Sequence, residues 1–175
     1  MRFDVMPVAT EKQILEVEAA ANKVWHNYYK DILSPEQIDY MLKKYQSKEA
    51  LYKQLAEGYI YYMLMVDDEL AGYMCVLVQS DCVNLSRLYI KAEYRRRGLA
   101  KRAINYFDTF FSSPNNGYNY IQKIRLNVER KNSFAINVYE HLGFHKVKAV
   151  DTDIGGGFFC NDYIMERRIQ RNRAE

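Results

Sequence analysis

Residues 88–100 read LYIKAEYRRRGLA and combine strand-forming, basic and helix-starting residues in one short segment. Leu88-Tyr89-Ile90 has strand character, a basic turn follows over residues 91–97, and a helix opens at Gly98. Free N–H groups at the start of a helix, together with the helix dipole, favour a bound anion. Because Gly98 carries no Cβ, the main chain there can approach a phosphate closely. The stretch therefore predicts a strand–turn–helix unit with an anion site at the turn.

The elements on either side of this unit predict a mixed sheet covered by helices. Before it, helices begin at the cap residues Thr10, Ser34 and Ser47, after a short strand over residues 2–6. Three strands then form an antiparallel meander over residues 59–66, 70–79 and 82–90. After the unit come a helix to residue 112, a strand at 121–128, a helix at 132–142, and strands at 144–150 and 158–168. Strand–helix–strand order in the middle implies a right-handed crossover and local parallel pairing.

Two further boundaries are predicted near the C-terminus. The glycine-rich residues 151–157 are expected to form a long turn before the last strand. The polar tail from Ile169 is expected to fray.

The composition is that of one globular domain over residues 1–175. A formal net charge of +3 is too small to demand a nucleic-acid partner. Residues 1–12 do not resemble a secretory signal, and the longest apolar stretch, residues 59–66, is too short for a membrane span. Three cysteines without paired spacing indicate a reducing compartment, hence a cytoplasmic location.

No metal site is expected. His141 and His145 are four residues apart, as a helical metal pair would be. However, Gly143 lies between them and is expected to end the helix, so the two rings need not share a face.

Two motifs in this order resemble the GNAT family of N-acetyltransferases. The sequence has neither a Walker loop nor a GxGxxG fingerprint. The segment Arg95-Arg96-Arg97-Gly98-Leu99-Ala100 instead matches the family's pyrophosphate motif, Gln/Arg-x-x-Gly-x-Gly/Ala, placed between a strand and a helix. Asn132, Ala135, Tyr139 and Gly143-Phe144 match a second motif, N-x-x-A-x-x-x-Y-x-x-x-G-F. The resemblance is clear over residues 59–168.

The resemblance implies an α/β fold of the α+β kind and an acetyl-CoA-dependent enzyme. The sheet would be mixed and mostly antiparallel, with about six to seven strands, a central parallel pair splayed apart, and helices on both faces. The reaction would move an acetyl group from acetyl-CoA to a primary amine within a ternary complex. The implied cofactor contacts are Leu88, Tyr89, Ile90, Arg95, Arg96, Arg97, Gly98, Leu99, Ala100, Lys101, Asn132 and Tyr139.

Tyr139 is the candidate general acid. A phenol can protonate the thiolate that leaves when an amine attacks the thioester. The alternative is a boundary tyrosine with a packed ring and a hydrated hydroxyl. Asn132 would cap its helix as well as contact the cofactor. For the base, Glu129 is the nearer candidate and Glu93 the poorer one, and both also fit solvated surface acids.

The amine acceptor stays open at this stage. The end of the chain resembles the bacterial branch that includes spermidine/spermine-type acetyltransferases, but a small amine or a peptide N-terminus is also compatible. The candidate acceptor contacts are Trp25, Tyr28, Tyr29 and Glu129, and the three aromatic residues could equally belong to the core. A polyamine would favour acidic lining such as Asp151 and Asp153.

Two alternatives belong to other functional classes. One is a coenzyme A sensor without turnover. The other is a basic nucleic-acid-binding module that uses the turn at residues 95–102, with strongly salt-dependent binding. Neither a nucleic acid nor a membrane is the expected partner, because the basic residues are confined to one turn and the net charge is small. Dimers are common among GNAT proteins, so a homodimer is compatible with the resemblance.

Overall fold

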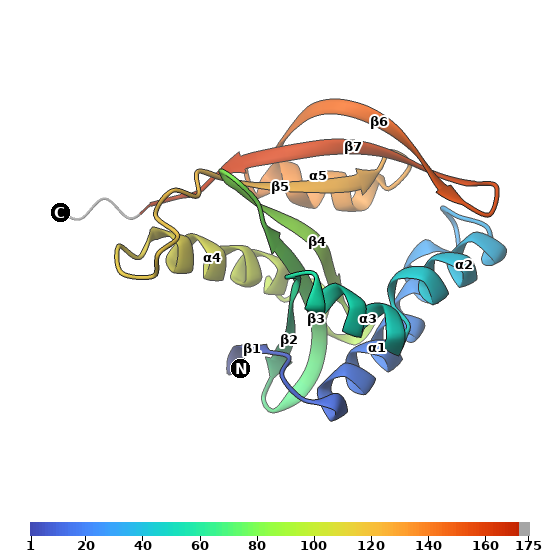
Figure 1. Ribbon diagram of the computed structural model, residues 1–175, viewed down its shortest axis with the longest axis horizontal. Coiled ribbons are helices and arrows are strands. Elements are labelled where there is room, and N and C mark those ends of the chain that lie inside the picture. The colour runs from blue at the N-terminus through green and yellow to red at the C-terminus, as the bar shows by residue number, and fades with distance from the viewer. Residues whose placement is uncertain (172–175) are drawn as a thin grey trace. The chain divides into compact units, whose positions relative to one another are not determined.

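Seven strands form a mixed, mostly antiparallel sheet in the order β1-β2-β3-β4-β5-β7-β6 in the computed structural model, which describes residues 1–171 (Figure 1). The strands are β1 (Phe3–Pro7), β2 (Ile60–Val66), β3 (Glu69–Val78), β4 (Cys82–Ile90), β5 (Lys123–Glu129), β6 (His145–Gly155) and β7 (Phe158–Arg168). The α-helices of the described chain are α1 (Glu11–Tyr29), α2 (Pro35–Tyr45), α3 (Lys48–Ala56), α4 (Leu99–Ser112) and α5 (Ser133–His141). The predicted fold class is therefore confirmed.

The chain divides into two compact units, and each contains part of β4. The first unit comprises Met1–Leu77 and Arg87–Leu99. The second comprises Val78–Ser86 and the chain from Ala100 onward. The units are described separately.

In the first unit, the three predicted helix starts are confirmed. The Thr10 side chain accepts a hydrogen bond from the Gln13 amide, and the Gln13 side chain accepts one from the Thr10 amide in return. Ser34 and Ser47 cap α2 and α3 in the same way, by accepting from the third amide of each helix. These bonds satisfy N–H groups that have no partner within a helix.

The core of this unit holds a buried polar chain. Trp25 is 2% exposed, and its indole N–H donates to the Tyr73 hydroxyl at 2.9 Å. Tyr73 donates to the Gln46 side chain at 2.7 Å, and the Gln46 amide donates to Tyr61 at 3.3 Å. The Tyr61 hydroxyl donates to the Gln54 side-chain oxygen at 2.8 Å. Because each member of this chain of hydrogen bonds has a partner, the side chains of Trp25, Tyr73 and Tyr61 are held in one arrangement.

Gly72 lets β3 approach the end of β4. A Cβ added at Gly72 would collide with the Tyr89 carbonyl oxygen and lie 3.1 Å from the Ile90 Cα. The neighbouring Ala71 carbonyl accepts from the Lys91 amide at 2.9 Å. The end of β4 is therefore fixed against β3 just before the basic turn.

In the second unit, β4 and β5 form the parallel pair that the sequence predicts. Cys82–Leu85 of β4 pair with Lys123–Leu126 of β5, and this ladder covers only part of either strand. Strand β5 pairs along its whole length with β7, antiparallel. The β6–β7 hairpin, orange and red in Figure 1, completes the unit.

Two sequence predictions at this end of the chain are wrong. Residues 151–157 are not one long turn, because Asp151 to Gly155 continue β6 and pair with residues 158–161 of β7. The turn is confined to Gly156 and Gly157, whose φ values of 63° and 78° favour glycine. The tail does not fray at Ile169, which is 8% exposed and donates its amide to the Gln122 carbonyl at 2.9 Å. The rest of that prediction, over residues 172–175, lies outside the described residues.

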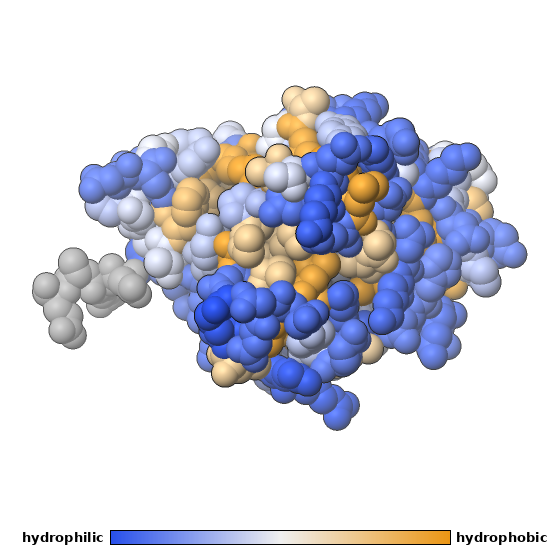
Figure 2. All heavy atoms as spheres, turned by 90° about the horizontal axis from the view of Figure 1, so that it is seen from below, coloured by the Kyte–Doolittle hydropathy of each residue, from blue (hydrophilic) through white to orange (hydrophobic). Residues whose placement is uncertain are grey.

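Three further features concern the surface, the cysteines and the helices. The face drawn in Figure 2 is mostly hydrophilic, with separate hydrophobic patches. Cys75, Cys82 and Cys160 form no disulfide bond within residues 1–171. Among residues 1–171, no helix combines the length and the apolar character needed to cross a membrane.

Gly72→Ala should lower the free energy of unfolding by about 3 kcal/mol, because the new methyl group meets main-chain atoms that cannot rotate away. The matched control is Gly117→Ala, where the added carbon meets nothing within 4 Å and only the φ of 76° causes strain, about 1 kcal/mol. Urea unfolding measures both. A cost at Gly72 no larger than at Gly117 would contradict the close approach.

Candidate functional site

The basic turn has two residues in the left-handed region. After Ile90 the chain forms a short 3₁₀ turn at Ala92–Tyr94, and α4 begins at Leu99. Between them, Arg96 has φ 60° and Gly98 has φ 72°. A non-glycine residue in this region carries strain, so the conformation at Arg96 is a local feature that the surrounding structure imposes.

This conformation exposes a group of main-chain amides. Within residues 1–171, no protein group accepts a hydrogen bond from the amides of Arg96, Arg97 or Gly98. All three residues are exposed, and a Cβ added at Gly98 would meet no atom within 4 Å. Leu99, in contrast, is 2% exposed and packs with Val66 and Ala71, which anchors the start of α4. Successive unpaired amides at a helix start can bind an anion such as a diphosphate.

The three arginines of the turn differ in their roles. The Arg95 Nε donates to the Ile90 carbonyl at 3.1 Å, and its guanidinium lies 5.4 Å from the Tyr28 ring centroid. The Arg97 side chain folds back to donate to the Glu93 carbonyl at 2.8 Å. Arg96 is exposed. The sequence motif gives no reason to distinguish the three arginines. In the structure, Arg95 and Arg97 stabilise the turn through bonds to its carbonyls, whereas Arg96 is exposed to solvent.

Arg95 also has an unused donor. Its Nη2 is buried and has no hydrogen-bond partner among the described residues. A buried donor of a charged group that lacks a partner costs free energy, so an acceptor at this position would be stabilised. The same guanidinium is held at the end of β4 by the bond from its Nε to the Ile90 carbonyl.

The predicted aromatic acceptor contacts lie in or beside the core of the first unit. Trp25 is buried, as described above. Tyr28 and Tyr29 are half-buried, with ring centroids 4.9 Å apart. The Tyr29 hydroxyl is 2.8 Å from the hydroxyl of Tyr89, on β4. Of the three, only Tyr28 and Tyr29 are exposed enough to touch a ligand without repacking.

The second unit holds the remaining motif residues. Ala100 and Lys101 form the first turn of α4. Asn132 is 5% exposed, and its side chain accepts from the Ala135 amide at 3.1 Å, so its predicted role as the cap of α5 is confirmed. Tyr139, on α5, is half-buried, and its ring meets the Phe144 ring edge-on at 5.6 Å.

Glu129 is held by main-chain donors. Its carboxylate accepts from the amides of Lys131 at 3.4 Å and Asn161 at 3.3 Å. It therefore connects the end of β5 to β7. The other candidate base, Glu93, is 3.8 Å from the Lys23 ammonium group in the first unit.

Asp162, on β7, is an acid that sequence reasoning missed. It stands opposite Glu129 in the β5–β7 register. Its pKa is raised to about 6, chiefly by burial and in addition by the charges of Glu129 and Asp151. A hydrogen bond from Asn127 opposes this rise. Arg130 lowers the pKa, and this arginine also forms an ion pair with Asp151. The signal was hidden because it depends on a strand register that composition does not reveal.

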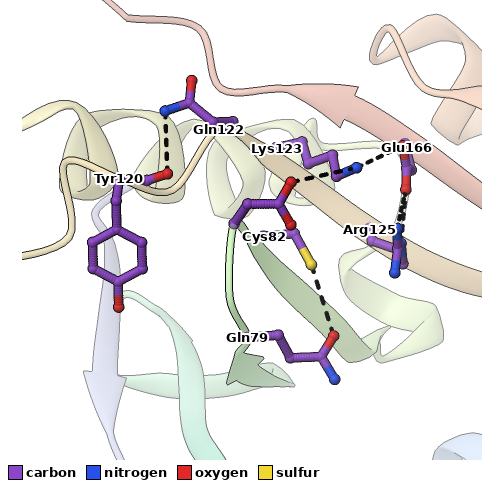
Figure 3. A network of polar contacts seen from close by, with 8 residues as sticks. Gln79, Cys82, Tyr120, Gln122, Lys123, Arg125 and Glu166 are labelled. Carbon is purple, nitrogen blue, oxygen red and sulfur yellow. Dashed lines mark hydrogen bonds and ion pairs between the residues drawn. The ribbon is translucent and has the colours of Figure 1, made fainter.

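A second polar group on β5 and β7 has a structural role. Figure 3 shows Lys123 and Arg125 of β5 directed at Glu166 of β7. The Arg125 Nε–Glu166 Oε1 distance is 2.7 Å and the Lys123 Nζ–Glu166 Oε2 distance is 3.4 Å. Burial alone would raise the pKa of Glu166, but the bonds to both cations lower it overall. These ion pairs hold β5 against β7.

Comparisons with known proteins agree with the motifs and the fold. The model of the acetyltransferase (GNAT) domain matches residues 29–158, well over half of the chain. The chain is 26% identical over 175 residues to the spermidine N(1)-acetyltransferase of Thermoplasma acidophilum, covering 97% of this chain and 99% of that protein. It is 29% identical over 127 residues to the N-alpha-acetyltransferase of Saccharolobus solfataricus, covering 64% of this chain and 71% of that protein.

A solved structure shares the fold. The PaiA N-acetyltransferase of Thermoplasma acidophilum, solved in complex with coenzyme A, matches with a TM-score of 0.76 and 24% sequence identity. The match covers 96% of this chain and 99% of that chain.

The raised pKa of Asp162 predicts a stability effect with a definite sign. The folded state binds this proton more tightly than the unfolded state, so the contribution to stability is present below about pH 4 and is lost as pH rises to about 6. Asp162→Asn cannot ionise and should therefore raise the free energy of unfolding near pH 7.5, by at most about 3 kcal/mol. The gain should be smaller at pH 4.5.

Urea unfolding at the two pH values checks this prediction. The matched control is Asp31→Asn, the same substitution at an exposed position. A gain for Asp162→Asn that is equal at pH 4.5 and pH 7.5 would show that ionisation of this carboxyl is not the cause.

Proposed function

The chain belongs to the GNAT family of acetyltransferases and transfers an acetyl group from acetyl-CoA to an amine, and from this premise we propose how its residues divide the work. The amides of Arg96 to Gly98 bind the pyrophosphate of the cofactor. Tyr139 protonates the leaving thiolate. The acceptor is a polyamine. The exposed amides of the turn carry the proposal, because three successive N–H groups without a protein acceptor, at the start of a helix, favour an anion such as a diphosphate.

The side chains of the turn support the same ligand. Exposed Arg96 supplies a charge that can reach a phosphate, while Arg95 and Arg97 keep the backbone in shape. The unpaired Nη2 of Arg95 gains an acceptor when the cofactor is bound. The first turn of α4, with Ala100 and Lys101, completes the contact by adding helix amides and a cation.

The direction of β4 supports a place for the pantetheine arm. The Tyr89 carbonyl points at Gly72 of β3. Main-chain groups of successive strand residues point to opposite edges, so those of Leu88 and Ile90 point away from β3. We assign these two residues to strand-like pairing with the arm. The Ile90 carbonyl already accepts from Arg95, so the pairing uses the groups that remain.

Tyr139 is placed on a short helix that is fixed at both ends. Asn132 caps its start, and Leu142 at its C-terminal end donates its amide to the carbonyls of Val138 and Tyr139. Attack of the neutral amine on the thioester forms a C–N bond and expels the coenzyme A thiolate. The Tyr139 phenol then gives its proton to that sulfur, and solvent or a base removes the proton that the amine releases.

Carboxylates in the second unit support a cationic acceptor. Asp162, Glu129 and Asp151 are close enough to influence one another electrostatically. The relative that matches this chain over 99% of that relative's length is a spermidine N(1)-acetyltransferase. A polyamine carries positive charges that such acids would attract. A peptide N-terminus is the second candidate, because the other relative is an N-alpha-acetyltransferase.

We also propose that residues 1–175 form one domain. From the cysteines, which form no disulfide bond within residues 1–171, we propose a reducing cytoplasmic environment.

Arg96→Gly should weaken acetyl-CoA binding about tenfold, because it removes a charged donor worth about 1.5 kcal/mol. Glycine accepts a φ of 60°, so the amides of the turn keep their positions. Calorimetry gives the dissociation constant. The control is Lys53→Ala on α3, which removes an equal charge from an exposed helix position. Equal effects of both changes would mean that only net charge matters, and the site assignment would be lost.

Spermidine should be a better substrate than a monoamine or a peptide, by about tenfold or more in kcat/KM. The reason is that spermidine carries two or more positive charges that can interact with the acidic residues. Assaying thiol release with spermidine, a monoamine of similar length and an Ala-starting peptide checks this. Asp162→Asn should narrow the difference between spermidine and the monoamine. Preference for the peptide would contradict the polyamine proposal and favour the second candidate.

A further inference from the structure

Arg167, on β7, connects two helices of the second unit through one buried guanidinium. Its side chain is 7% exposed. The Nη2 atom donates to both carboxylate oxygens of Asp108 on α4, each at 2.6 Å. The Nη1 atom donates to the Leu142 carbonyl, at the C-terminal end of α5, at 3.3 Å. One planar group therefore fixes the distance between a point on α4 and the end of α5.

The Gly143-Phe144 pair of the second motif is shaped around this arginine. Gly143 has φ 88°, and a Cβ added there would lie 3.3 Å from the Arg167 Cδ. The guanidinium lies 5.5 Å from the Phe144 ring centroid. A side chain at position 143 would displace the arginine, and the aromatic ring at 144 gives it a face to lie on.

The same residues hold Tyr139. The amides of Leu142 and Phe144 both donate to the Tyr139 carbonyl at 3.0 Å. The Phe144 ring also meets the Tyr139 ring, with an interplanar angle of 65°. The Tyr139 main chain and ring thus both rest on groups that Arg167 contacts.

We propose that Arg167 is a positioning residue for acetyl transfer, which orients Tyr139 through the Leu142 carbonyl and the Phe144 ring. This inference rests on the proposed role of Tyr139 as the general acid. A buried ion pair often contributes little net stability compared with apolar side chains of similar volume. Its directional bonds can instead fix a geometry, and small displacements of a catalytic group lower turnover strongly. Arg167 touches neither substrate in this account and acts only through Tyr139.

The main test replaces the ion pair with apolar groups in the variant Asp108→Leu with Arg167→Met. Removing both charges leaves no unpaired buried ion, so the fold should persist, but the bond to Leu142 is lost. We expect kcat to fall about tenfold or more, while the dissociation constant for acetyl-CoA changes less than about twofold. Arg167→Lys is a milder second variant, because lysine keeps a positive charge beside Asp108 but lacks the second nitrogen that bonds the Leu142 carbonyl. It should lower kcat less than the double variant does.

A double-mutant cycle separates positioning from a general loss of structure. In a Tyr139→Phe background the Arg167 changes should lower kcat no further, because the group that they orient has already been removed. The matched control is Arg125→Met with Glu166→Leu, which removes the ion pairs of Glu166 with Arg125 and Lys123 (Figure 3) and should have the same small effect with or without the Tyr139 hydroxyl.

The outcomes are distinguishable. If Tyr139→Phe lowers kcat and the Arg167 effect persists in full on top of it, the positioning role is overturned while the role of Tyr139 survives. If Tyr139→Phe leaves kcat unchanged, both are overturned. An unchanged kcat in the Arg167 variants also overturns the inference.

Hydrogen exchange gives a readout that does not depend on activity. The amides of Leu142 and Phe144 should exchange about tenfold faster in Arg167→Lys, because the end of α5 loses its anchor. Amides of β5 that pair with β7 should keep their protection. Uniformly faster exchange across β5, β7 and α5 would indicate a structural role only and would contradict the inference.

Discussion

Two left-handed residues, Arg96 and Gly98, turn the chain from β4 into α4 and leave three successive amides without an acceptor in the described protein. The surrounding contacts impose this conformation. Gly72 lets the end of β4 lie against β3, Arg95 holds the Ile90 carbonyl, and buried Leu99 anchors the first turn of α4. Each contact fixes one side of the turn. The strain at Arg96 is therefore supported by packing, and the exposed amides that result are the proposed pyrophosphate site.

The second unit follows the same principle with different parts. Its candidate acid, Tyr139, is on a nine-residue helix, too short to be stable by itself. Asn132 fixes the start of that helix, and the contacts of Arg167 fix its end. On the same β-strands, the paired cations around Glu166 and the acids around Asp162 form two separate polar groups. The first stabilises the β5–β7 pairing, and the second supplies negative potential for the proposed acceptor.

The sequence predicted features that local chemistry determines. The caps at Thr10, Ser34 and Ser47 and the strand–turn–helix unit are confirmed because each depends on residues close in the chain. The parallel pair joins strands that are distant in the chain, and it was predictable because strand–helix–strand order implies a crossover connection. The predicted length of β6 was wrong. The glycines suggested a turn, whereas pairing with residues 158–161 of β7 continues the strand. The different roles of the three arginines rest on bonds within the turn, from Arg95 to Ile90 and from Arg97 to Glu93, which depend on its backbone geometry and not on residue type alone. The raised pKa of Asp162 depends on tertiary contacts, so no local pattern revealed it. The single domain over residues 1–175 stays a prediction.

The most direct measurement of the central claim is a titration of ¹⁵N-labelled protein followed by NMR at the amides of Arg96, Arg97 and Gly98. Coenzyme A should shift all three resonances, because its pyrophosphate accepts their hydrogen bonds. Pantetheine, which lacks phosphate, should leave them nearly unmoved while it affects β4. If saturating coenzyme A leaves these three resonances in place, the turn is not the pyrophosphate site and the account built on it fails.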